Sequence, residues 1–135
     1  MEGGVHLKWE MRPIATVRNG ISDSPRNWDK VRSRLVFKRA YVDGLYKLSH
    51  FRHIWVIFGF HKNRETLMRI HPCHDAKKPL VGVFASCSPT RPNKIGLTRV
   101  ELVSVKGSIV TVMGLDAYDG SPVFDIKPDM KEIDY

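Results

Sequence analysis

Three short polar segments combine residue types that could bind a ligand or take part in catalysis. The first, residues 86–96, contains two prolines, Arg91 and Asn93 ahead of Gly96. The X-Pro steps hold the backbone extended, the Arg and Asn side chains supply hydrogen-bond donors, and the glycine permits close approach. Such a loop suits a carboxylate, a phosphate or the edge of a nucleotide. The same pattern also describes a rigid surface loop that binds nothing.

The other two segments are residues 115–122 and residues 61–63. In the former, Asp116 and Asp119 lie three positions apart beside a Gly-Ser-Pro sequence and could accept hydrogen bonds from ribose hydroxyls or an amino group. The Asp-Gly step by itself predicts no more than a tight turn. The latter, a His-Lys-Asn sequence, follows the longest apolar run, where loops on a rigid scaffold often carry function. Its histidine could equally cap the end of a strand.

The sequence gives little support for a metal site, for a Gly-rich nucleotide-binding loop or for a nucleophilic serine. The histidines of residues 50–53 and 71–74 do not form the paired ligands of a typical zinc site, because one enters an apolar strand and Pro72 breaks the other spacing. We therefore predict no metal. The Gly-rich fingerprints of dinucleotide and NTP binding are absent. Ser88 lacks the glycine frame of a nucleophilic serine.

Short strands must position these segments. Runs of apolar or alternating residues, bounded by turn-forming residues, predict strands at residues 13–18, 33–38, 53–60, 80–85, 97–103, 109–115 and 123–126. Residues 53–60 are apolar on both faces, which predicts a central strand covered on both sides.

One short helix is predicted at residues 41–48, and residues 61–78 read as a long polar excursion with one helical turn near 66–70. The sequence therefore predicts a mostly β fold: a barrel with one or two short helices and a long excursion after the central strand. Residues 1–135 are expected to form a single domain.

The charge suggests a polyanionic partner. The formal net charge is +8, and the basic residues crowd the first third of the chain, whereas the last twenty residues lean acidic. Excess positive charge speeds encounter with nucleic acid, although a solvated basic surface is an equal alternative.

The location is expected to be the cytoplasm. No apolar run approaches the length needed to span a bilayer, and residues 1–9 lack the pattern of an export signal. Cys73 and Cys87 do not suggest a disulfide framework.

Three motifs together resemble the TsaA-like family, of the TrmO type. Residues 81–98 resemble its signature G-V-F-A-T-R-S-P-x-R-P-N-P-I-G-L, and residues 51–56 resemble its F-S-H-I-W-V strand. Residues 114–128 resemble its ending G-L-D-x-x-D-G-T-P-V-x-D-I-K-P. The motifs occur in the family's order, and the resemblance covers about residues 13–128.

This resemblance implies a single-sheeted β-barrel that forms a homodimer and binds S-adenosyl-L-methionine. It implies methyl transfer to N6 of the threonylcarbamoyl-adenosine beside the anticodon of tRNA. The anticodon loop is then the partner, and no membrane is involved. Carried over by motif, the cofactor-binding residues are Pro25, Arg26, Asn27, His61, Lys62, Cys87, Arg91, Asn93, Leu97, Asp119, Gly120, Ser121 and Pro122. His61 and Asp116 are the candidates for a catalytic proton acceptor.

The chain departs from the family pattern at Cys87, which replaces the arginine of A-T-R-S-P and removes a fork of donors. Arg52 and Lys94 stand where the family has serine and proline, and either of them, or Arg91, could compensate. Two other functions therefore remain open. One is a non-catalytic barrel that binds RNA or a nucleotide, and the other is a methyltransferase with a different acceptor.

Overall fold

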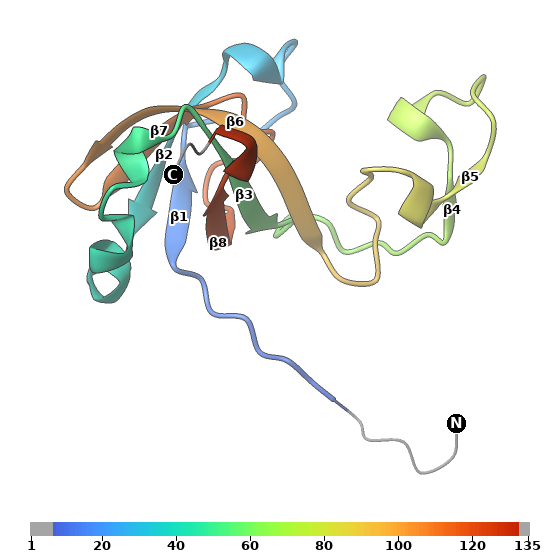
Figure 1. Ribbon diagram of the computed structural model, residues 1–135. Helices are drawn as coiled ribbons and strands as arrows, with labels where there is room; N and C mark the ends of the chain where they lie inside the picture. The colour runs from blue at the N-terminus through green and yellow to red at the C-terminus, as the bar shows by residue number, and fades with distance from the viewer. Residues whose placement is uncertain (1–6, 133–135) are drawn as a thin grey trace.

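The computed structural model describes residues 7–132, and its main element is a closed, six-stranded antiparallel β-barrel (Figure 1). Its strands are ordered β1-β2-β7-β6-β3-β8, and β8 closes the barrel by pairing with β1. The strands are β1 (Ala15–Arg18), β2 (Arg32–Phe37), β3 (His53–Gly59), β6 (Ile95–Lys106), β7 (Ile109–Met113) and β8 (Pro122–Pro128). The predicted mostly β, single-sheeted barrel is confirmed.

Strict alternation along the strands builds the barrel core. In β2, Ser33, Leu35 and Phe37 are buried while their neighbours are exposed. In β3, alternate residues from Ile54 to Phe58 are also buried, but the residues between them are only half covered. The prediction that this strand is covered on both sides was therefore only partly correct, because its outward-facing side chains are half exposed. A one-sheet barrel has a single interior, so the outer face of a strand meets only loops and solvent.

The short helical segments of residues 7–132 are all of the 3-10 type. Residues predicted as one helix form two turns, η2 (Arg39–Leu45) and η3 (Leu48–His50). Lys47 lies between them in the left-handed region, with φ of 66°, which ends any continuous helix. The remaining turns are η1 (Trp28–Lys30), η4 (Pro72–His74), η5 (Val83–Ala85) and η6 (Met130–Glu132). None of the helical segments among residues 7–132 is long and apolar enough to cross a membrane.

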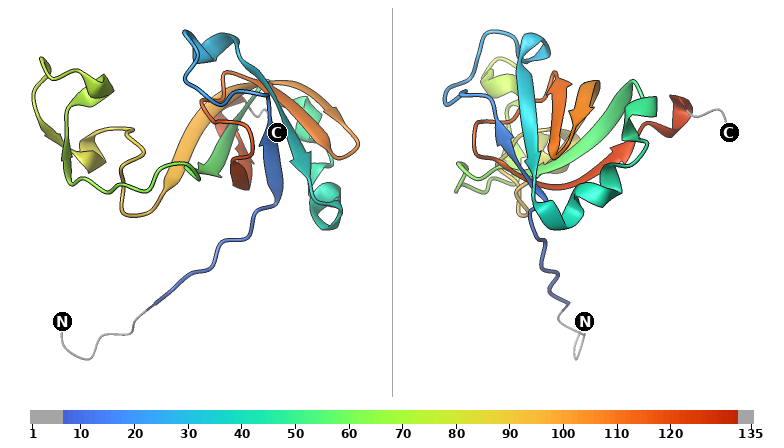
Figure 2. Two further views of the ribbon diagram at one scale, coloured as in Figure 1. Left: turned by 180° about the vertical axis from the view of Figure 1, so that it is seen from behind. Right: turned by 90° about the vertical axis from the view of Figure 1, so that its left-hand side faces the viewer.

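The excursion comprises residues 61–94 and projects to one side of the barrel (Figures 1 and 2). It contains its own two-stranded sheet, β4 (Arg69–Ile70) paired with β5 (Val81–Gly82). The helical turn predicted at residues 66–70 was wrong, because Ile70 buries its side chain through this pairing. The strand predicted at residues 80–85 is short, because Ser86 N–H donates to Val83 O at 3.1 Å and closes η5.

The excursion begins and ends at hydrogen-bonded neighbours. Gly59 at the end of β3 pairs with Ile95 at the start of β6, and Phe60 N–H donates to Lys94 O at 3.0 Å. Next to this junction, Gly96 lies against the ring of Phe58, and an added Cβ would be 2.5 Å from the ring. The barrel is therefore closely packed where the excursion leaves it.

The opposite end of β3 is fixed by charged side chains. His53 Nδ1 lies 2.5 Å from Glu132 Oε1, and Arg99 Nε donates to Asp129 Oδ2 at 2.7 Å. The hydrogen bond from Arg99 holds the pKa of Asp129 below its ordinary value of 3.8. These contacts anchor η6 to β3 and β6, so functional loops have room at the other end of the barrel.

Candidate functional site

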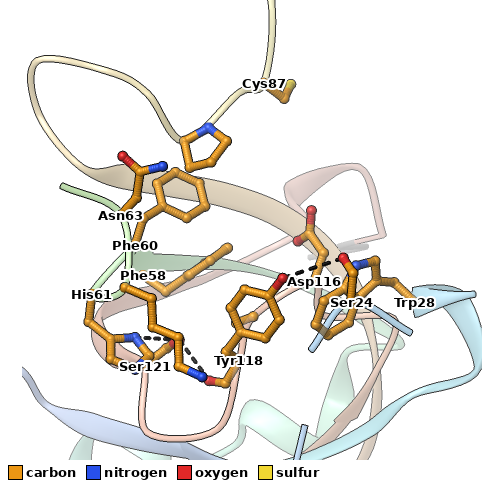
Figure 3. Close-up of a pocket in the computed structure, with 13 residues that line it drawn as sticks. Ser24, Trp28, Phe58, Phe60, His61, Asn63, Cys87, Asp116, Tyr118 and Ser121 are labelled. Atoms are coloured by element: carbon orange, nitrogen blue, oxygen red, sulfur yellow. Dashed lines mark hydrogen bonds between the residues drawn. The ribbon is translucent and has the colours of Figure 1, made fainter. Parts of the chain in front are cut away.

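A cavity of about 350 Å³ opens at the end of the barrel where β3 stops (Figure 3). Phe58 and Phe60 from the end of β3 line it, and their rings meet edge to face with centroids 5.3 Å apart. Trp28 and Tyr118 form a second edge-to-face pair at 5.6 Å. Four aromatic rings from three separate loops or strand ends therefore surround one opening, a lining that suits a flat heteroaromatic ring.

Lys62 is the cation of this cavity. Its Nζ lies 5.0 Å from the centroid of the Tyr118 ring and donates to Ser22 O at 3.1 Å. Tyr118 Oη in turn donates to Ser24 Oγ at 3.4 Å. Among the described residues, no other Lys or Arg side chain lines the cavity. An anionic group bound here would therefore pair with Lys62.

His61 lines the same cavity, in surroundings that disfavour the charged form of its ring. Burial of the ring, reinforced by the neighbouring Lys62, lowers the pKa of His61 below its ordinary 6.5, against the opposing charge of Asp119. Ser121 Oγ lies 3.2 Å from His61 Nδ1 and donates its own proton to Tyr118 O at 2.7 Å. Since a hydroxyl has one proton, Ser121 must accept from Nδ1–H, which leaves Nε2 of His61 with a free lone pair.

Asp116 lies on the cavity edge above the barrel interior (Figure 3). Its Oδ1 accepts from Thr98 Oγ1 at 2.5 Å, which fixes the carboxylate over β6. The side chain is exposed, and its second oxygen has no partner among the described residues. A ligand amino or amide N–H could donate to that oxygen.

Asp119 faces away from the cavity. Its carboxylate accepts from Asn19 N–H at 2.9 Å, Gly20 N–H at 3.1 Å and Arg18 at 3.5 Å. These backbone hydrogen bonds lower the pKa of Asp119 below its ordinary 3.8. Asp119 thus joins the turn after β1 to the turn before β8, and this places Tyr118 and Ser121 at the cavity.

The loop of residues 86–96 is organised by Arg91. Its Nη1 donates to three backbone carbonyls, of Val83 at 3.0 Å, Ser86 at 2.7 Å and Ser88 at 3.3 Å. Lys94 Nζ donates to Glu65 O and to Thr66 Oγ1. Both cations are therefore engaged with groups of the excursion, and Arg91 donates to the carbonyls on either side of Cys87.

The structure brings part of the predicted site together. Of the residues predicted from the sequence, the cavity is lined by His61, Lys62, Cys87, Ser121 and the catalytic candidate Asp116. It is not lined by Pro25, Arg26, Asn27, Arg91, Asn93, Leu97, Asp119, Gly120 or Pro122.

The structure shows where three of these outlying residues lie instead. Asn27 caps η1 by accepting from Asp29 N–H at 3.0 Å. Leu97 is 60% exposed on the outside of the barrel, and Gly120 adopts φ of 87° in the turn beside His61. The immediate neighbours of the outlying loop, Ser24 and Trp28, do line the cavity.

Sequence reasoning missed the residues that build the walls. Ser24, Trp28, Phe58 and Phe60 lie outside the three polar segments, whereas Asn63, Pro89, Ala117 and Tyr118 lie within those segments but were not named as site residues. The position of Tyr118 between two motif aspartates was an available signal. The pairing of Trp28 with Tyr118 was not, because it joins residues far apart in the sequence.

A family model and the similar proteins of known sequence indicate the same family. Residues 12–135 match the family model described as the tRNA-methyltransferase O N-terminal domain. A "Probable S-adenosyl-L-methionine-binding protein" of Methanothermobacter thermautotrophicus is 39% identical over 133 residues, covering 95% of each chain. The "tRNA (adenine(37)-N6)-methyltransferase" of Mus musculus is 43% identical over 91 residues, covering 64% of this chain and 20% of its own length.

A solved structure agrees in fold. The crystal structure of TrmO from Pseudomonas aeruginosa superposes with a TM-score of 0.72 at 28% identity, covering 90% of this chain and 56% of the other. The chain thus spans a little over half of that structure and one fifth of the mouse methyltransferase, but nearly all of the archaeal relative.

Proposed function

The chain belongs to the tRNA-methyltransferase O N-terminal domain family, and from this premise we propose that it is an S-adenosyl-L-methionine-dependent tRNA methyltransferase. The proposed acceptor is N6 of the threonylcarbamoyl-adenosine beside the anticodon. The observation that carries this proposal is the cavity at the end of β3, which combines four aromatic rings with one lysine and one histidine.

The residues of this cavity fit the proposed cofactor. The rings of Phe58, Phe60 and Tyr118 suit an adenine ring, and the Lys62 ammonium suits the carboxylate of a methionine. When bound, S-adenosyl-L-methionine supplies an electrophilic methyl group on a sulfonium. Such transfer depends on close, linear placement of donor and acceptor more than on a strong base. The aromatic walls would supply that placement and exclude water.

Two side chains are candidates to receive the proton that the acceptor nitrogen loses. His61 offers the lone pair on Nε2, because Nδ1 is engaged with Ser121. Asp116 offers the carboxylate oxygen that Thr98 leaves free. Both groups line the cavity, so either can reach a ligand placed within it.

The proposed assembly is a homodimer of single-domain chains that binds the anticodon loop of tRNA in the cytoplasm. Exposed apolar side chains on the excursion and on β6 support self-association, notably Phe84, which is 71% exposed, and Leu97, which is 60% exposed. The exposed side chains of Arg26 and Lys30 flank Trp28 and support contact with tRNA phosphates.

A second candidate function is a barrel that binds RNA or a nucleotide without catalysis. Cys87 favours it, because the family's arginine is missing there. The available substitutes are engaged elsewhere: Arg91 and Lys94 bond within the excursion, and Arg52 precedes β3 at the opposite end of the barrel. Loss of a charge-assisted hydrogen bond would weaken cofactor binding by about 1.5–3 kcal/mol.

Titration calorimetry with S-adenosyl-L-methionine tests the proposal, using the natural protein and the Cys87→Arg variant. We expect saturable binding by the natural protein and tighter binding by the variant. Transfer of labelled methyl to tRNA carrying threonylcarbamoyl-adenosine should then follow, with unmodified tRNA as the control.

Three other outcomes would decide between the alternatives. Binding by the variant alone would select the non-catalytic barrel. Labelled methyl on a different acceptor would select a methyltransferase of other specificity. No binding by either protein would exclude the proposed cofactor site.

A further inference from the structure

A second cavity, of about 780 Å³, adjoins the first and lies between the excursion and the barrel end. From the excursion it is lined by residues that include Arg69, Leu80 and Ala85. Its size falls within the range of pockets that hold small ligands. The cavity at the end of β3 does not include any of these three residues.

The two cavities share one wall. Trp28, Cys87, Pro89 and Asp116 line both of them. Any reaction that joins a group held in one cavity to a group held in the other must therefore take place at this wall. Methyl transfer has that requirement, because donor and acceptor atoms must come into contact.

We propose that the second cavity receives the acceptor base, so that the excursion forms the substrate half of the site. This inference rests on the proposed methyltransferase function. Enzymes that modify a base act on a single strand or turn the base out of its stack into a pocket. The second cavity is the larger of the two and is lined mostly by the projecting segment, so it offers room for a base turned out of the anticodon loop.

Three side chains match the chemistry of that base. Trp28, on the shared wall, offers an aromatic face on which a base can stack. Asp116 is the one carboxylate that lines both cavities among the described residues, and its free oxygen can accept from the N6–H. Arg69 lines only the second cavity and could pair with the carboxylate of a threonylcarbamoyl group.

Charge around the excursion fits an RNA backbone. Arg64, Arg69, Lys77 and Lys78 are all exposed, and none of them forms an ion pair among residues 7–132. Cations in this arrangement would contact phosphates on either side of an inserted nucleotide. Lys62 remains for the cofactor side, since it lines only the first cavity.

Blocking the second cavity with bulk tests the assignment. Ala85→Trp and Ala76→Trp each place an indole in this cavity from the excursion, and Ala40→Trp adds the same bulk to η2 outside both cavities. We expect the two blocking variants to lower kcat/KM for modified tRNA by about 100-fold while the Kd for S-adenosyl-L-methionine changes less than about twofold. The Ala40 variant should match the natural protein in both measurements.

Arg69→Gln, with Arg64→Gln as its matched control, tests the carboxylate contact. Equilibrium binding is measured with two anticodon stem-loops, one carrying threonylcarbamoyl-adenosine and one carrying adenosine. We expect Arg69→Gln to reduce the preference for the modified loop about tenfold and Arg64→Gln to leave the preference unchanged. Because this readout needs neither cofactor nor turnover, it still decides the second cavity if the natural protein binds no S-adenosyl-L-methionine.

Two results would overturn the inference. If both blocking variants fold and weaken S-adenosyl-L-methionine binding but not stem-loop binding, the cofactor occupies the second cavity. If they alter neither, the acceptor binds elsewhere. Absence of methyl transfer by the natural protein would instead count against the proposed function, while stem-loop binding weakened by Ala85→Trp would still support the substrate cavity.

Discussion

In the barrel, alternate side chains of six strands fill a common interior, and residues such as Val17, Leu35 and Ile54 are fully buried. In the excursion, Met68, Leu80 and Phe84 are at least half exposed, and Ile70, Val83 and Thr90 are the buried residues among those whose burial the structure describes. The barrel is thus stabilised by its apolar core, whereas the excursion depends mainly on hydrogen bonds to its backbone. The barrel can hold one half of the site rigidly while the excursion adapts the other half to a ligand.

Truncating one leucine in each region should show the largest difference. Leu35→Ala removes a side chain that is 0% exposed and should lower the free energy of unfolding by about 2–5 kcal/mol. Leu80→Ala removes one that is 51% exposed and should change it by less than about 0.5 kcal/mol. Urea unfolding followed by circular dichroism measures both. A comparable loss in the Leu80 variant would mean that the excursion is part of the cooperative core.

Adding one methyl group to a glycine in each region tests the same difference in packing between the barrel and the excursion. Gly96→Ala places a Cβ 2.5 Å from the Phe58 ring, so we expect a loss of about 1–3 kcal/mol from overpacking. Gly82→Ala is the matched control in β5, because the nearest atom to its added Cβ is Met68 O at 3.9 Å. The control should be neutral or slightly stabilising in the same unfolding measurement. An equally stable Gly96 variant would contradict the close packing at the barrel end.

Replacing Arg91 should affect the excursion alone. A lysine cannot donate to three carbonyls in the same planar geometry, so Arg91→Lys should make local opening of residues 86–91 easier by about 1.5 kcal/mol. Hydrogen exchange of these amides should become about tenfold faster, while exchange in β3 and β6 stays unchanged. Faster exchange throughout the barrel would show that the two regions open together.

Acid should weaken the barrel by a smaller amount through Asp129 and Asp119. Both have pKa values held below the ordinary 3.8, so each contributes stability above that pH, and the contribution is lost as the pH falls through the lower folded value. Asp129→Asn should therefore reduce the dependence of the urea midpoint on pH below about 4. An unchanged pH dependence in this variant would contradict the role of the Arg99 contact.

The sequence predicted the barrel better than the excursion, for a physical reason. Alternation in residues 33–38 and 109–115 reports burial directly, so these strands were found nearly at their true bounds. Residues 66–70 have no such pattern, and their two-residue strand depends on pairing with Val81 and Gly82. Local sequence cannot show a pairing of that kind.

Only some of the residues that line the first cavity were predicted from the sequence, for the same reason. Motif residues such as His61 and Ser121 were found because they lie in segments whose residue types carry chemistry. The second aromatic pair was missed, since only closure of the barrel brings Trp28 to Tyr118. Arg91 was predicted as a ligand donor, but its donors are directed at the carbonyls of its own loop.

The pairing of Gly59 with Ile95 also bears on how quickly the barrel can form. β3 and β6 are neighbours in space, but residues 61–94 separate them in the chain, so their contacts count as long-range ones. Because of the lost chain entropy, closing such a loop costs about 2.5 kcal/mol more free energy than closing a two-residue turn. Folding rates fall as contact order rises. Replacing the excursion with a tight turn would therefore give a barrel that folds faster and has lost most of the lining of its second cavity.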